Sequence, residues 1–304
     1  MNMKSWSRRE LLRRSGALAA AWAVGGLARP AVASPMGRPV GIQLYAVGSA
    51  LQENPAATLR SIKDIGYGEV ETAGFAKLSA KEFRKLLDDA GLKCPSGHLQ
   101  FDVANLGPTF EAAHTLGMQY VASGGLRASL TPPITGPMSA MTLDEAKRTA
   151  ELANRIGEQA KQAGLQYAYH NHNIEFADHG GVIGYDILLR DTQPQLVKFE
   201  IDCGWMVLGN RNPVDYFRKY PDRFPLIHVK DFLPPPDRGE AVGRSTENHA
   251  GAELGRGMID YRPIFAAAEK AGLQHYFVEQ EGPFVRMNQL QAAEQAYAYL
   301  SAIG

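Results

Sequence analysis

The sequence predicts a single (β/α)8 barrel of the α/β class, and two features of the chain support this fold. Past residue 34, eight short apolar segments typical of β-strands alternate with amphipathic helical segments. Polar residues that can bind a metal or move a proton follow several of these strands, and parallel α/β barrels place their active sites there. The alternative, a doubly wound open sheet, is disfavoured because no Gly-x-Gly-x-x-Gly pattern of a dinucleotide site follows the first strand.

The predicted elements come in a regular order. The strands are residues 40–45, 68–72, 92–98, 119–122, 166–172, 197–202, 225–230 and 275–281. The helical segments include residues 54–65, 80–90, 143–163, 184–190, 213–219, 261–271 and 288–302. Glycine follows four of these helices, at Gly66, Gly91, Gly164 and Gly272. Glycine in this position is typical of a left-handed cap that turns the chain into the next strand.

The composition favours a small uncharged ligand. The chain of 304 residues is 45% hydrophobic and 21% charged, and 32 basic residues balance 32 acidic ones. No overall field therefore attracts nucleic acid or an anionic membrane. Cys94 lies in one predicted strand and Cys203 at the end of another, and nothing in the sequence brings these two strands together. We therefore expect buried free thiols rather than a disulfide.

The first 34 residues have the pattern of a secretory signal peptide. A basic segment containing Arg8-Arg9 precedes an apolar, Ala-rich run at residues 16–27, and Ala31-Val32-Ala33 supplies a small-x-small cleavage site. The apolar run is too short for a mature membrane span. The adjacent arginines resemble a twin-arginine signal, with ordinary Sec export as the alternative. We expect a periplasmic or secreted barrel of residues 35–304 that is not embedded in a membrane.

Two irregular segments, residues 124–141 and 233–257, follow predicted strands at the end of the barrel where the active site is expected. Long loops at this end are typical walls or lids of a binding site.

Polar side chains end the last four predicted strands. They are His170, His172, Asp202, His228, Glu279 and Glu281. Side chains alternate between the two faces of a strand, so the members of each close pair share a face. Imidazole and carboxylate ligands together suit Mn, Fe, Co, Zn or Ni. The four strand ends therefore predict one divalent transition-metal ion, although any one of these residues alone would more often be a satisfied core group.

Several short motifs carry a resemblance to a known family. They are Gly41-Ile42-Gln43-Leu44-Tyr45, Val70-Glu71, His98, Asp202, His228-Val229-Lys230-Asp231, Glu253-Leu254-Gly255-Arg256-Gly257-Met258-Ile259-Asp260 and Phe277-Val278-Glu279. In their order and spacing, from about Val40 to the C-terminus, the chain resembles the sugar phosphate isomerase/epimerase superfamily of xylose isomerase-like TIM barrels.

The resemblance implies a set of metal ligands. It implies one divalent ion held by His170, Asp202, His228 and Glu279, with His170 where family members often carry a glutamate. In the family's epimerases that glutamate and the last one form the acid and base pair, so Glu279 is the carboxylate that remains. Trp205 stands where many members carry a histidine, and an indole can stack on a sugar face.

The chemistry expected of such a site is removal of a proton next to a carbonyl. A bound divalent ion stabilises the enediolate that forms, and a base with a suitable pKa must lie near the carbon. The candidates for moving the proton are Glu279, His170, His172 and Lys230. The residues expected to line the sugar pocket are Gln43, Tyr45, Glu71, His98, Trp205 and Arg256, with barrel packing or a solvated loop charge as the alternative for each.

The leading expectation is therefore an exported, metal-dependent enzyme acting on a sugar or keto-sugar. Isomerisation, epimerisation and elimination from a 3-keto-glycoside all begin with this proton transfer. A related abasic-site endonuclease is disfavoured by the neutral charge and the signal peptide. A sugar-binding protein without catalytic activity is the remaining alternative. The sequence says nothing about the oligomeric state.

Overall fold

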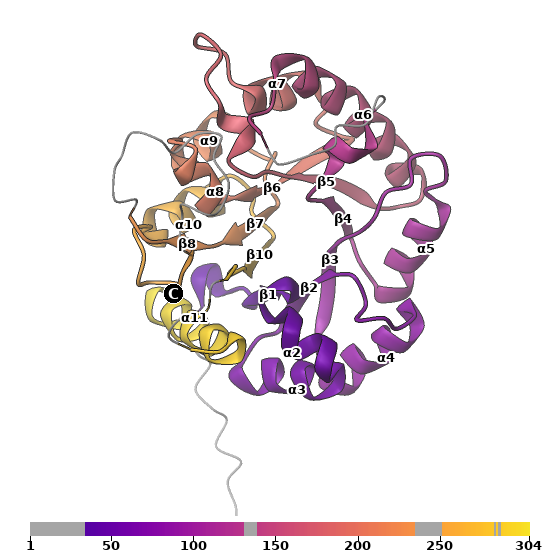
Figure 1. The fold of residues 1–304 in the computed structure, drawn as a ribbon, viewed down its shortest axis with the longest axis vertical. Helices are drawn as coiled ribbons and strands as arrows, with labels where there is room; N and C mark the ends of the chain where they lie inside the picture. The colour runs from indigo at the N-terminus through magenta and orange to yellow at the C-terminus, as the bar shows by residue number, and fades with distance from the viewer. Residues whose placement is uncertain (1–33, 131–138, 235–250, 283, 285–286) are drawn as a thin grey trace, which may run out of the picture. The chain divides into compact units, whose positions relative to one another are not determined.

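The predicted barrel is confirmed. The computed structural model describes residues 34–130, 139–234, 251–282, 284 and 287–304, and the expected signal peptide lies outside them. Eight parallel strands close in the order β1-β10-β7-β6-β5-β4-β3-β2 (Figure 1). They are β1 (Gly41–Gln43), β2 (Glu69–Ala73), β3 (Lys93–His98), β4 (Tyr120–Ser123), β5 (Gln166–His170), β6 (Val197–Asp202), β7 (Leu226–Val229) and β10 (His275–Val278).

Helices surround these strands (Figure 1). The longer ones are α3 (Pro55–Ile65), α4 (Ala80–Ala90), α5 (Gly107–Leu116), α6 (Leu143–Gln162), α7 (Gly184–Asp191), α9 (Pro213–Lys219), α10 (Tyr261–Lys270) and α11 (Gln289–Ile303). The shorter ones are α2 (Gly48–Glu53) and α8 (Cys203–Leu208), with 3₁₀ turns η1 (Pro35–Gly37), η2 (Leu44–Val47), η3 (Leu126–Ser129) and η4 (Ile174–Phe176). None of the helices in the described part of the chain is both long and apolar enough to cross a membrane.

Local sequence signals set the helix ends. Three helices, α4, α6 and α11, begin with a capping box. In each, the side chain of the N-cap residue accepts a hydrogen bond from the backbone N–H three residues on, and the side chain of that third residue accepts one from the N-cap backbone N–H. The four glycines predicted to end helices all have positive φ, from 68° at Gly91 to 131° at Gly66. These predictions of helix ends are confirmed.

The apolar core lies mainly between the strands and the surrounding helices. Inside the barrel a small apolar cluster packs across it, formed by Ala122, Ala168, Leu226 and Phe277. Since Leu226 precedes His228 on β7 and Phe277 precedes Glu279 at the end of β10, this cluster lies below the polar residues of the strand ends. Cys94 and Cys203 are buried free thiols, as predicted.

Some predicted boundaries are wrong. The first strand ends at Gln43 because residues 44–47 form a 3₁₀ turn, and β5 and β10 end at His170 and Val278, before the last predicted residues. The antiparallel pair of β8 (Asp231–Phe232) and β9 (Gly251–Ala252) has too few residues to show a period in the sequence. Parts of the two predicted irregular segments, residues 131–138 and 235–250, lie outside the described residues.

Candidate active site

A cavity of about 250 Å³ opens at the C-terminal ends of the strands. Its lining residues are Gln43, Tyr45, Ala73, His98, Gly124, His170, His172, Trp205, Glu279 and Glu281. Seven of the predicted site residues are therefore brought together around one space. A larger cavity, of about 650 Å³, lies near the starts of β2 and β3 and contains none of them, so its size does not mark the chemistry.

His228, on β7, connects two sets of carboxylates. Its Nδ1 lies 3.0 Å from Oε2 of Glu279, and its Nε2 lies 2.6 Å from Oε2 of Glu71. Burial disfavours the imidazolium form, but Glu200 and Glu279 outweigh it and raise the pKa of His228 well above its ordinary value. The ring is fully buried, so these contacts fix its orientation.

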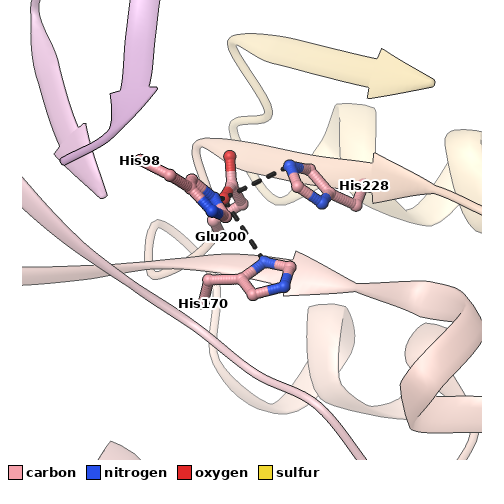
Figure 2. Close-up of side chains that lie close together, drawn as sticks. All are labelled: His98, His170, Glu200 and His228. Atoms are coloured by element: carbon pink, nitrogen blue, oxygen red, sulfur yellow. Dashed lines mark hydrogen bonds and ion pairs between the residues drawn. The ribbon is translucent and has the colours of Figure 1, made fainter. Parts of the chain in front are cut away.

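Three histidines gather around Glu200 (Figure 2). Oε2 of Glu200 lies 2.6 Å from Nε2 of His98, 3.3 Å from Nδ1 of His170 and 3.3 Å from Nε2 of His228. These side chains come from β6, β3, β5 and β7. Burial lowers the pKa of His170 well below its ordinary value, with the charge of His228 acting in the same direction, so His170 is a neutral imidazole.

Lys230 is a buried ammonium surrounded by carboxylates. Its Nζ lies 3.2 Å from Asp202, 2.7 Å from Glu279 and 2.6 Å from Glu281. Burial disfavours the charged form, but these carboxylates outweigh burial and raise the pKa of Lys230. The ammonium also lies 4.9 Å from the ring centroid of Trp205. Lys230 can therefore donate hydrogen bonds at neutral pH but cannot accept a proton there.

Asp202 is held from two sides. Its Oδ1 accepts a hydrogen bond from the backbone N–H of Trp205 at 2.8 Å, which caps α8. Its backbone exchanges hydrogen bonds with the side-chain amide of Asn171, at 3.1 and 3.3 Å. This contact fixes the end of β6 against the residue that follows β5.

His172 faces the cavity next to His170 and Trp205. The centroid of the His172 ring lies 5.1 Å from the ring centroid of His170 and 5.8 Å from that of Trp205. Burial, reinforced by the charge of Lys230, lowers the pKa of His172 to about 3, so its imidazole is neutral. The backbone N–H of His172 donates to Glu175 at 3.0 Å, and this buried carboxylate also accepts from the hydroxyl of Tyr169 at 2.8 Å.

The remaining predicted pocket residues differ in position. Tyr45 is 58% exposed at the rim of the cavity, whereas Trp205 is buried and packs on Phe232. Glu71 is fully buried, does not line the cavity and accepts hydrogen bonds from Gln43 and Ser96. Arg256 is exposed and is not among the lining residues.

Two overlapping groups of side chains have the composition of a metal site. The His98 group is His98, His170, Glu200 and His228, and the Asp202 group is His170, Asp202, His228 and Glu279. In each group the candidate ligand atoms lie within 4.8 Å of one another. Nδ1 of His170, Oε1 of Glu200 and Oδ2 of Asp202 are buried and make no hydrogen bond among the described residues, although Nδ1 lies 3.3 Å from Glu200 and Oδ2 lies 3.2 Å from Lys230. Unpartnered donor atoms of this kind fit a bound cation.

The sequence analysis gave no role to Glu200 or Glu175, and it named Glu281 only among the polar residues that end the last four strands. Glu200 lies two residues before Asp202 on β6, and strand alternation alone puts both on one face. That signal was sufficient to propose Glu200 as a site residue. No comparable signal marks Glu175, because its role depends on a short turn that returns it beneath His172.

Comparison with known proteins is consistent with this geometry. A family model described as a xylose isomerase-like TIM barrel matches residues 59–303. Inosose dehydratase of Lacticaseibacillus casei is 31% identical over 172 residues, which are 53% of this chain and 55% of that protein. The chain thus spans about half the length of the curated relatives it matches.

Solved structures extend the comparison over most of the chain. A sugar phosphate isomerase/epimerase from Parabacteroides distasonis is 26% identical with a TM-score of 0.68, covering 87% of this chain and 94% of that one. A xylose isomerase-like TIM barrel protein from Mycobacterium smegmatis, solved in complex with magnesium, is 16% identical with a TM-score of 0.63, covering 89% and 98%. The second likeness shows the fold alone.

Proposed function

The chain belongs to the xylose isomerase-like TIM barrel family, and from this premise we propose that it is a metal-dependent enzyme that removes a proton next to the carbonyl of a sugar or keto-sugar. One observation carries the proposal. A single cavity brings a neutral imidazole, His172, and a carboxylate, Glu279, next to two groups of side chains able to hold a divalent cation.

The size and lining of the cavity support a small carbohydrate as the substrate. A volume of about 250 Å³ is just below the usual range for drug-sized ligands, which suits one sugar ring. Tyr45, 58% exposed at the rim, offers an aromatic face that can pack on the C–H face of a sugar. Gln43 and Glu281 offer polar atoms for hydroxyl groups.

The proton acceptor in this proposal is His172. It lines the cavity and belongs to neither of the two metal-binding groups. Its pKa of about 3 makes it a weak base in the free protein, so the negative charge that develops on the substrate beside it must raise this pKa as the proton moves. Glu279 is less free to accept the proton because Lys230 and His228 both bind it. A divalent cation held by His170 and His228, which both groups share, would stabilise the negative charge that builds on the carbonyl oxygen.

We propose that elimination is the outcome, with loss of water or an alcohol from the carbon beyond the one that loses its proton. Two-base epimerisation needs an acid or base on each side of the carbon, and His170 replaces one of the two carboxylates that would supply this pair. Partial similarity to inosose dehydratases supports the same choice. The export predicted from the first 34 residues fits this choice, because free glycosides occur outside the cell.

The test is a reaction in heavy water with inososes and 3-keto-glucosides, followed by NMR. With the metal-loaded protein we expect an unsaturated product and, in the recovered substrate, deuterium at the carbon next to the carbonyl. His172→Gln should lower the rate about 10²- to 10⁴-fold, while His114→Gln on exposed α5 should not change it. Deuterium exchange with a new stereoisomer and no loss of a leaving group would replace elimination by epimerisation. No exchange with any substrate would contradict the enzyme proposal.

A further inference from the structure

A second cavity adjoins the active-site cavity. It has a volume of about 400 Å³ and shares Ala73 and His98 with the first, so the two spaces meet where β2 and β3 end. Its walls are the turn that follows β2, residues 98–100 after β3, and the first half of α5. Since the first cavity suits one sugar ring, the second gives room for a substrate that extends beyond the ring.

The lining of the second cavity is mostly apolar. Of the described residues that line it, only His98 can carry a charge at neutral pH, and the other polar side chains are those of Gln100 and Thr109. The hydroxyl of Thr109 already donates to the backbone oxygen of Gln100 at 2.8 Å. The larger apolar side chains are those of Phe75, Leu99, Pro108 and Ala112.

This lining favours an apolar group over a second sugar or a phosphate. A second sugar would bury several hydroxyl groups that each need a hydrogen-bond partner, and the cavity has few side chains that can provide one. A phosphate would need cationic partners such as arginine, which the described lining does not contain. An aromatic or alkyl group, by contrast, gains free energy when it leaves water for such a surface.

The turn after β2 holds Phe75 at the wall of this cavity. The Phe75 ring is partly buried, and its centroid lies 6.0 Å from that of the fully buried Phe83, so the core fixes its position. Ala76 and Lys77 follow with φ of 50° and 65°, which is uncommon for residues other than glycine. Backbone of this kind costs free energy and is concentrated at ligand sites.

We propose that the second cavity binds the leaving group of the elimination, and that this group is an apolar alcohol. The substrate is then a 3-keto-glycoside with an aromatic or alkyl substituent. The inference rests on the proposed function and adds the chemical class of the substituent. His172, the proton acceptor, follows β5, whereas the second cavity begins at the ends of β2 and β3, so a sugar ring in the first cavity can reach both.

The reaction balances for this substrate. The proton next to the carbonyl goes to His172, and the electron pair of the C–H bond forms a double bond to the neighbouring carbon. The bond from that carbon to the glycosidic oxygen breaks, and the oxygen takes up a proton from solvent and leaves as the alcohol. An unsaturated keto-sugar remains, and no oxidant or reductant is consumed. The carbon atoms of the alcohol take no part, so the second cavity acts through binding and orientation.

Two substrates test the proposal on the unsubstituted protein. Benzyl and methyl 3-keto-β-D-glucoside differ only in the leaving alcohol, and the two alcohols have similar acidity. We expect kcat/KM to be about 10- to 200-fold higher for the benzyl compound. Ala112→Phe fills the second cavity from α5 and should bring this ratio close to one. Ala298→Phe, at an exposed position of α11 that lines neither cavity, should keep the ratio.

A binding measurement separates the cavity from the reaction. Benzyl and methyl β-D-glucoside lack the carbonyl and cannot eliminate, and calorimetry should show at least about tenfold tighter binding of the benzyl compound. Equal kcat/KM for the two keto-glucosides, or a benzyl preference that survives Ala112→Phe, would overturn the proposal and leave the proposed function standing. Tighter benzyl binding without elimination of either keto-glucoside would support the apolar cavity and contradict the proposed function. Equal binding of the two glucosides would count against the cavity.

Discussion

Lys230 is the residue on which the charge balance beside the cavity depends. Its ammonium is 2% exposed and contacts three carboxylates, those of Asp202, Glu279 and Glu281. The raised pKa means that its contribution to stability is fully present below the ordinary lysine value of about 10.4 and is lost only as the pH rises through the higher folded value. At neutral pH the ion pairs therefore contribute in full.

Replacing this ammonium should be strongly destabilising. Lys230→Met removes the ammonium that three carboxylates share in or near a buried site and leaves Glu279 and Asp202 with only one other cationic partner, His228, which should lower the free energy of unfolding by about 3–5 kcal/mol at pH 7. The deficit should shrink at lower pH, because the carboxylates can then take up protons. Urea unfolding at pH 7 and pH 5 measures both effects. The control is Lys85→Met, whose partner Asp89 is exposed, with an expected change below about 0.5 kcal/mol. Equal effects of the two substitutions would contradict the prediction.

Glu175 positions His172 without touching the cavity. Glu175→Ala removes the acceptor for the backbone N–H of His172 and for the hydroxyl of Tyr169. We expect a loss of about 1–3 kcal/mol in stability and faster hydrogen exchange at the amide of His172. Glu158→Ala, on the exposed face of α6, is the control and should change neither. Unchanged exchange at His172 would show that this turn is held by other contacts.

Individual site residues could be predicted where strand alternation was enough. His170, Asp202 and His228 follow from the ends of their strands, and the structure places them within reach of one another. Glu71 was expected in the sugar pocket, yet it points into the buried layer below, where it binds His228. The level of Glu71 in the barrel depends on how far neighbouring strands are shifted along one another, and the residue pattern of one strand does not reveal this shift.

The interior of α6 packs closely on Leu196, the residue that precedes β6. Gly157 lies in the interior of α6, and a Cβ atom at this position would lie 2.5 Å from the backbone oxygen of Leu196. Helix propensity alone would favour alanine over glycine here. The close contact of helix and backbone therefore explains a glycine that the helical pattern by itself does not.

Two glycine-to-alanine substitutions should change the stability of the protein in opposite directions. Gly157→Ala should destabilise the protein by about 1–3 kcal/mol, because the new methyl group has no space. Gly48→Ala, in α2 with ordinary helical φ and nothing within 4 Å, should stabilise it by about 0.4–1 kcal/mol. Thermal unfolding of both variants under one set of conditions is the measurement. A stabilising effect at Gly157 would mean that α6 can shift away from β6.

Longer elements were more predictable than short ones. The helical period and the terminal glycines predicted the ends of α4 and α6 to within one residue. The six-residue helices α2 and α8 are too short to show a helical period. The second begins where the side chain of Asp202 caps it, so one residue serves both the site and the helix.

On the scale of the whole molecule, we propose that residues 1–34 direct export by the twin-arginine route. Replacing Arg8 and Arg9 by lysine should leave the protein in the cytoplasm, because that route reads the arginine pair. Cell fractionation, with the unsubstituted protein as the control, measures this. N-terminal sequencing of the exported form should show Ser34 or Pro35 as its first residue. Equal export of the lysine variant would indicate the Sec route.

The pairing of β1 with β10 joins Gly41 to Phe277 and closes the barrel. Strand β1 is synthesised early, but its second neighbour, β10, lies near the end of the chain and is synthesised late. Until the last strand leaves the ribosome, β1 and β7 each present an open edge, and such edges invite pairing between chains. Loop closure over this separation also slows folding. The chain is therefore most prone to aggregate between its synthesis and the closure of the barrel. A chaperone that shields strand edges would have its greatest effect on the yield of folded protein in this interval.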